Sequence, residues 1–160
     1  MFRSAFLAAP FLLAAAPVAA QEADAPKAEQ PLVIEILSGI TFSRLALTGK
    51  GQASAAIDPQ TGEKRTDDGV VDLGGMAVEG RARITGEPHR GVRVTFPGSV
   101  TMTSTTSGTA ELSEFTTDLA AWPVLDAGGF LEFSFGGRLK MTGPVGGSLR
   151  GRIPISVDYN

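Results

Sequence analysis

The C-terminal stretch Ile153-Pro-Ile-Ser-Val-Asp-Tyr159 alternates strictly between large and small or polar side chains. Successive side chains of a β-strand point to opposite faces, so Ile153, Ile155, Val157 and Tyr159 share one face. Burial of four such side chains contributes roughly 1.5–3 kcal/mol each. We therefore predict that this stretch, within a strand over Leu149–Tyr159, belongs to the core of a β-sheet protein.

Pro154 lies on the opposite face of the same predicted strand. Proline has no N–H group to donate to a hydrogen-bond ladder, so it belongs on an edge strand or at a bulge. A long apolar strand at a sheet edge offers a place where another chain pairs. The sequence therefore predicts a core strand that is open to a partner.

Upstream of this stretch, short runs with strand-like alternation recur between turn residues. About ten short strands at regular spacing predict a single all-β domain, an antiparallel β-sandwich. Between the strands, the charged segment Glu63–Asp68 is expected to be a loop. The segment Leu119–Ala127 contains Pro123, which argues against a long helix, so we expect a helical turn or an irregular crossover there. The other expected strands are Leu32–Leu37, Ile40–Leu47, Gly51–Ile57, Val70–Leu73, Val78–Thr85, Val92–Phe96, Val100–Thr105, Leu112–Asp118, Leu131–Phe135 and Leu139–Met141.

The N-terminal region has the layout of an export signal followed by a linker. Residues 1–20 contain a basic start, an apolar run and small residues before Gln21, as in a secretory signal peptide. Residues 21–30 are polar, rich in Ala and Glu, and without periodicity, which indicates a flexible leader. We expect residues 31–160 to form one exported domain in the periplasm, at the cell surface or in the medium, with no membrane span in the mature chain.

The composition excludes several classes of function. The 160 residues include 14 Lys and Arg against 17 Asp and Glu, one His and no Cys. A nucleic-acid-binding protein normally carries a basic face, so we expect no nucleic-acid partner. The lack of cysteine excludes disulfides, thiol nucleophiles and thiolate metal sites.

Candidate chemical groups do not form a recognisable catalytic or metal-binding pattern. His89 lies in a Gly-rich loop without a nucleophile motif, and the acidic group Asp58, Glu63, Asp67 and Asp68 does not have calcium-loop spacing. We therefore expect no enzyme activity, no cofactor and no metal. Trp122 beside Pro123 is either a platform for a sugar or part of the core, and the sequence leaves this open.

The C-terminus is similar to that of the pilins assembled by chaperone–usher systems. The shared features are the penultimate aromatic Tyr159, the alternating Val157, Ile155 and Ile153, and Gly147 fourteen places from the end. The resemblance implies an immunoglobulin-like, pilin-like sandwich that lacks one strand. It also implies a periplasmic chaperone and further copies of the chain as partners.

The mature chain also resembles a secreted bacterial family known as domain of unknown function 4402, over Leu32–Asn160. The resemblance rests on Pro31-Leu-Val-Ile34, Leu73-Gly-Gly75, Ile84-Thr-Gly-Glu-Pro88, Val92–Pro97, Gly136-Gly-Arg-Leu139 and Ile155–Asn160. Phe42-Ser43, where the family tends to have Phe-Gly, and the charged loop Glu63–Asp68 depart from the pattern. This resemblance implies a fold and a compartment and names no reaction.

Two functions are consistent with these patterns. The first is an exported structural subunit, a fimbria-like surface protein that assembles by β-strand exchange. The alternative is a monomeric periplasmic or extracellular binding module that uses the loop Gly86–Gly91 or the Trp122 region. Leu32–Leu37 pairs either within its own domain or with another subunit, and the sequence does not decide between them. The residues expected to act in assembly are Leu32, Val33, Ile34, Ile36, Gly147, Ile153, Ile155, Val157 and Tyr159.

Overall fold

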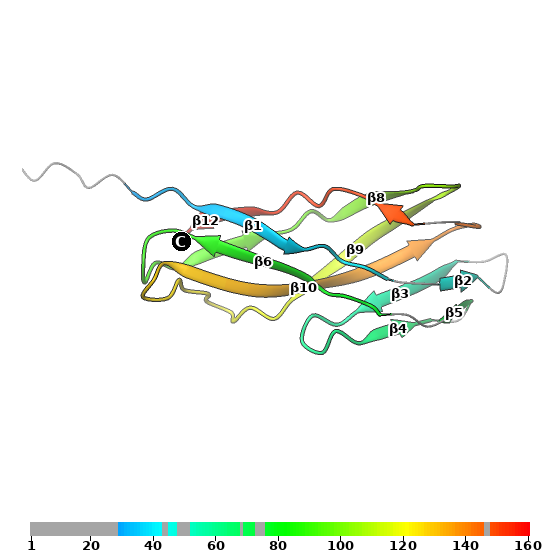
Figure 1. Ribbon diagram of the computed structural model, residues 1–160, viewed down its shortest axis with the longest axis horizontal. Helices are drawn as coiled ribbons and strands as arrows, with labels where there is room; N and C mark the ends of the chain where they lie inside the picture. The colour runs from blue at the N-terminus through cyan, green and yellow to red at the C-terminus, as the bar shows by residue number, and fades with distance from the viewer. Residues whose placement is uncertain (1–28, 43–44, 48–51, 68, 73–75, 146–147) are drawn as a thin grey trace, which may run out of the picture.

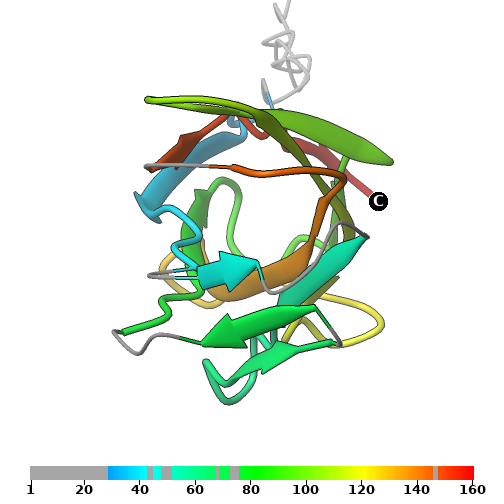
Figure 2. The ribbon, with the colours of Figure 1, turned by 90° about the vertical axis from the view of Figure 1, so that its right-hand side faces the viewer.

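The computed structural model describes residues 29–42, 45–47, 52–67, 69–72, 76–145 and 148–160. Within these ranges the chain is all-β and antiparallel, in curled sheets that form a β-sandwich (Figures 1 and 2). The predicted signal peptide and most of the predicted leader lie outside the described residues. The strands are β1 (Val33–Ser38), β2 (Leu45–Leu47), β3 (Ala53–Ile57), β4 (Lys64–Thr66), β5 (Val70–Asp72), β6 (Gly80–Thr85), β7 (Val92–Thr95), β8 (Ser99–Ser104), β9 (Thr109–Thr117), β10 (Phe130–Met141), β11 (Leu149–Arg150) and β12 (Ser156–Tyr159).

Strand β10 is the centre of the largest sheet. It pairs with β9 along one edge, and along the other edge with β6 in its first half and β3 in its second half. Strand β1 extends the sheet beyond β6, and β4 extends it beyond β3. On the far side of β9 the order continues through β8 to β11.

The strand β10 corrects the prediction of two separate strands. Gly136 and Gly137 suggested a break between Leu131–Phe135 and Leu139–Met141, but the strand runs through both glycines. A Cβ atom at Gly136 would lie 2.0 Å from the carbonyl oxygen of Ile57 on β3. Glycine is therefore required here because the neighbouring backbone approaches closely.

The charged segment after Ile57 also differs from its prediction. Lys64–Thr66 is strand β4, paired with β3, within the segment that the sequence suggested was a loop. The Lys64 side chain is buried, and its Nζ atom lies 2.6 Å from Asp72 Oδ1. Charged side chains are common on edge strands, where they discourage pairing with other chains.

The region of Leu119–Ala127 is an irregular crossover, one of the two predicted alternatives.

The end of the chain forms two short strands instead of the single strand predicted over Leu149–Tyr159. Strand β11 pairs with β8, β12 pairs with β7, and Gly151–Ile155 belongs to neither ladder. Pro154 lies in this interval, as its missing N–H group requires. The predicted alternation holds, because Ile153, Ile155, Val157 and Tyr159 are half-buried and their neighbours are exposed.

The core consists of two apolar clusters. The first contains Val70, Met102, Leu112, Leu139 and other buried residues, and the second contains Ile84, Val92, Leu125, Phe133 and Phe135 among others. Ile40 and Ile153 pack against both clusters. These two side chains therefore mark the place where the clusters meet.

Ser113 on β9 provides a test of this core. Its side chain is 6% exposed, and its hydroxyl oxygen has no hydrogen-bond partner among the residues that the structure describes. Burial of an unpaired polar group carries a desolvation penalty, so the change Ser113→Ala is expected to leave stability unchanged or raise it by about 1 kcal/mol. Urea unfolding of both proteins measures the difference. A loss of more than about 1 kcal/mol would contradict the burial of an unpaired hydroxyl.

Candidate functional site

An apolar groove lies between β1 and the C-terminal segment. It has a volume of about 780 Å³. One wall contains Ile34, Ile36, Gly39 and Ile40, and the other is the segment Leu149–Ile155. Among the residues predicted to act in assembly, Ile34, Ile36, Ile153 and Ile155 thus lie along the same groove.

The floor of the groove is the junction of the two core clusters. Met102 and Leu112 belong to the first cluster and Phe135 to the second, and all three line the groove. Ile36 is 50% exposed although it faces this apolar space. The floor of the groove is therefore buried, and its exposed apolar surface comes from the wall residue Ile36.

One wall of the groove is the edge strand β1, and the other consists of the edge strand β11 and the segment Gly151–Ile155, which belongs to no ladder. In the strand pairings of the described residues, β1 pairs with β6, β11 with β8 and β12 with β7. Among the described residues no ladder joins β1 to Gly151–Ile155, although β1 and β12 run near each other at one end of the molecule (Figure 1). The two edges therefore have backbone groups that an additional strand would pair with.

Tyr159 fixes the C-terminus to the start of β1. Its hydroxyl oxygen accepts a hydrogen bond from the Glu87 N–H at 2.7 Å, and its O–H donates to the Gln30 carbonyl oxygen at 2.7 Å. The guanidinium group of Arg90 lies 4.7 Å from the centre of the Tyr159 ring. The penultimate aromatic residue that the sequence singled out is therefore a structural lock between both ends of the domain.

Arg90 also connects this lock to the segment before β1. It forms ion pairs with Glu29 at 2.8 Å and with Glu87 at 3.0 Å. The hydrogen bond to Glu29 is the main reason that the pKa of Arg90 is raised above its ordinary value. Both partners are partly exposed, so these ion pairs contribute little to stability.

The remaining residues predicted for assembly have other positions. Leu32 and Val157 pack against the second core cluster. Val33 points away from the core and is 56% exposed. Gly147 lies outside the described residues. Strand β1 pairs with β6 of its own chain, so the structure has the intramolecular pairing that the sequence left open.

Several residues of the groove were not found by sequence reasoning. Gly39, Ile40, Met102, Leu112 and Phe135 line it together with Arg150 and Arg152. These residues come from segments that are far apart in the sequence, so no local sequence pattern marks them as one site. The local signals were limited to the apolar run Leu32–Leu37, whose partner the sequence left open between its own domain and another subunit, and the alternation that marked Ile153 and Ile155.

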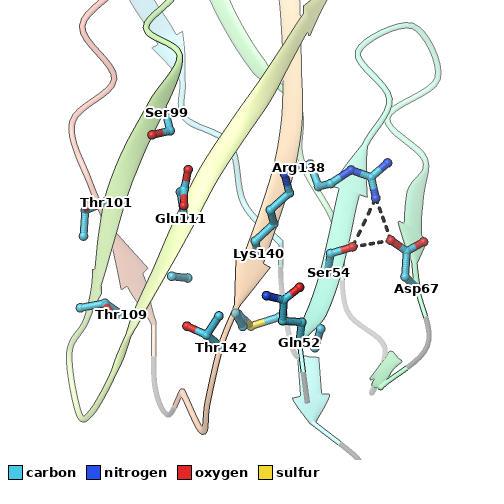
Figure 3. A pocket seen from close by; sticks show the side chains of 13 residues that line it. Gln52, Ser54, Asp67, Ser99, Thr101, Thr109, Glu111, Arg138, Lys140 and Thr142 are labelled. Atoms are coloured by element: carbon cyan, nitrogen blue, oxygen red, sulfur yellow. Dashed lines mark hydrogen bonds and ion pairs between the residues drawn. The ribbon is translucent and has the colours of Figure 1, made fainter.

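A second hollow, of about 710 Å³, lies on the polar outer face of β3, β8, β9 and β10 (Figure 3). Arg138 binds Asp67 and Glu114, and Lys140 binds Glu114 at 2.6 Å. Hydrogen bonds from Lys140 and then Arg138 lower the pKa of Glu114 below its ordinary value. The charges that line this face are thus largely used in pairing with one another.

The candidate chemical groups do not converge. His89 is exposed, and its backbone N–H donates to the Leu125 carbonyl oxygen. Asp58 and Glu63 lie near Arg65, Asp67 pairs with Arg138, and Asp68 is outside the described residues. In the part of the chain that the structure describes, no three His, Asp or Glu side chains are grouped to hold a metal. Within the same part, no helix is long and apolar enough to cross a membrane.

Comparison with known proteins gives one match. The sequence model of a family described as "Domain of unknown function (DUF4402)" matches residues 34–159. No curated protein and no solved structure matches the chain. The matched range contains all of β1 except Val33, the residues that line the groove and the C-terminal strand β12.

Proposed function

The chain belongs to the DUF4402 family of domains of unknown function, and from this premise we propose that it is an exported, non-enzymatic structural subunit. In this proposal copies of the chain assemble at the cell surface or outside the cell by exchange of a β-strand. The observation that carries the proposal is the apolar groove between the edge strands β1 and β11, which no strand of the described residues bridges.

Strand β1 of a second copy is the occupant that we propose. It is apolar on both faces, and its side chains Val33 and Ile36 are 56% and 50% exposed in their own domain. Elements with little apolar burial open at a lower free-energy cost than core elements. Release of β1 from one copy is therefore easier than release of a central strand such as β10.

The groove provides the entry for this strand. An incoming β1 pairs first with the open edges along the groove and then takes the place beside β6 that the resident strand leaves. Main-chain hydrogen bonds supply affinity in such strand addition, and alternate side chains supply specificity. Charge supports the same occupant. Glu29 precedes β1 and Glu35 lies within it, whereas Arg150 and Arg152 line the groove, so the incoming strand and the groove carry opposite charges.

The substitution Gly39→Phe is expected to stop assembly. A Cβ atom at Gly39 meets no atom of the described residues within 4 Å, and Gly39 lines the groove, so a bulky side chain there is expected to occupy groove space. We expect the secreted wild-type protein to form ladders on a denaturing gel when it is not heated, and the Gly39→Phe variant to run as a monomer. The heated samples should be identical.

Gly98→Phe is the matched control. A Cβ atom at Gly98 also meets nothing within 4 Å, and Gly98 lies in the turn between β7 and β8, away from the residues that line the groove. This variant is expected to form ladders like the wild type. Ladders that persist in Gly39→Phe, or a wild type that stays monomeric at all concentrations, would overturn the proposal.

A further inference from the structure

Trp122 is the one tryptophan of the chain, and it is 80% exposed. Its position is on the irregular crossover between β9 and β10. Tryptophan has a large apolar body and is usually well covered in a folded protein. So large an exposed aromatic surface indicates a binding role.

The backbone on both sides of Trp122 is held firmly. The Val92 N–H donates to the Pro123 carbonyl oxygen at 2.9 Å, and the Leu125 N–H donates to the Arg90 carbonyl oxygen at 2.9 Å. Leu125 is fully buried in the second core cluster, and Leu119 packs against that cluster. The indole ring therefore has a fixed backbone position, which reduces the entropy lost when a ligand binds.

A small hollow of about 210 Å³ adjoins the indole ring. Besides Trp122, its lining includes Arg93 from β7, Thr117 from β9 and the C-terminal residue Asn160. These three side chains offer a guanidinium group, a hydroxyl and an amide, which together donate and accept hydrogen bonds. The hollow thus has an apolar wall and polar groups within one small volume.

We propose that this hollow binds one hexose residue of a neutral glycan. One face of a pyranose ring presents C–H groups that are slightly positive, and the face of an indole ring is negative. The ring hydroxyls then bond to Arg93, Thr117 and Asn160. Small-molecule sites combine an apolar surface with a few polar groups in the same way.

The surroundings of Trp122 favour a sugar over a lipid surface. Ala120 and Ala121 are small, and the exposed carboxylates of Asp118 and Asp126 lie before and after the segment. Negative charge on the residues that flank the segment in sequence opposes contact of the segment with the anionic headgroups of a membrane. This site is independent of the groove, since no residue lines both.

Tryptophan fluorescence tests the proposal directly, because all of the signal comes from Trp122. We expect one of the neutral hexose oligomers maltohexaose, cellohexaose and mannohexaose to shift the emission in a saturable way and to protect the ring from acrylamide. Titration calorimetry should give a matching affinity. The variant Trp122→Ala is expected to lose at least tenfold in affinity, and Trp122→Phe to lose less.

Arg93→Ala should weaken binding of the same oligomer severalfold, whereas Arg65→Ala, which changes an exposed arginine on β4 outside both the hollow and the groove, should leave the affinity unchanged. An unchanged unfolding midpoint shows that each variant is folded. The proposal is overturned if none of the three oligomers changes the emission. It is also overturned if only vesicles of phosphatidylglycerol and phosphatidylethanolamine change the emission, which would indicate a membrane contact instead.

Discussion

Tyr159→Ala is expected to lower the free energy of unfolding by about 3 kcal/mol. The change removes a half-buried ring from the second core cluster and the contact of that ring with Arg90. It also removes the hydroxyl that bonds Glu87 and Gln30. Urea unfolding followed by circular dichroism measures the loss.

Tyr159→Phe separates the ring from the hydroxyl. It keeps the packing and leaves the Glu87 N–H and the Gln30 carbonyl oxygen without this partner, so the expected loss is about 1–2 kcal/mol. A loss below about 0.5 kcal/mol for the alanine variant would contradict the view that the chain's last strand belongs to the core.

Phe135→Ala is expected to have the largest effect on stability, a loss of about 3–5 kcal/mol. Phe135 is 1% exposed. The centre of its ring lies 5.5 Å from the ring centre of Phe96 and 6.1 Å from the ring centre of Phe133. Removal of the ring leaves a cavity in the second core cluster, beside the groove that Phe135 lines. Thermal and urea unfolding report the loss, which approaches the total stability of many domains.

Phe130→Ala is the control on the same strand. Phe130 is 45% exposed at the start of β10, so its removal is expected to change stability by less than about 1 kcal/mol. Equal losses for Phe130→Ala and Phe135→Ala would contradict the assignment of the core to the inner face of β10.

The fold class was predictable because local alternation determines which side chains share a face. The half-buried Ile153, Ile155, Val157 and Tyr159 lie on one face as predicted. The glycine pair in β10 misled the prediction, since a glycine that allows close backbone approach has the same sequence signal as a glycine that ends a strand. Only the three-dimensional neighbour, Ile57, distinguishes the two cases.

The groove was predictable only in part. Ile34 and Ile36 were identified from the apolar run Leu32–Leu37, and Ile153 and Ile155 from the alternation of the last strand. All four residues line the groove. Its floor residues Met102 and Leu112 were not, because their common position depends on which strands pair. Strand partners are set by long-range contacts that a single sequence does not reveal.

Trp122 illustrates the same limit. Its sequence context was equally consistent with core packing and with a surface platform. Its exposure follows from the crossover, which is fixed at Leu119 and Leu125 and turns the residue between them outward. That arrangement depends on tertiary contacts, so the two interpretations could be separated only by the structure.

Disulfide trapping tests the central claim, that β1 passes from one copy to another. The chain has no cysteine, and Val33 on β1 pairs with Thr85 on β6. The Cα atoms of antiparallel partners lie about 4.5–5.5 Å apart, within the range for a disulfide bond. Cysteines at these two positions therefore form a disulfide bond between β6 and the β1 strand paired with it, whether this strand comes from the same chain or from another copy.

The decisive measurement mixes the single variants Val33→Cys and Thr85→Cys under conditions of assembly, oxidises them and separates them without reductant. The account predicts a covalent dimer that contains one chain of each variant, and none when Gly39→Phe is also present in both. The double variant should form an internal disulfide before assembly. If the mixture gives no mixed dimer while the double variant closes fully within its own chain, strand exchange is contradicted.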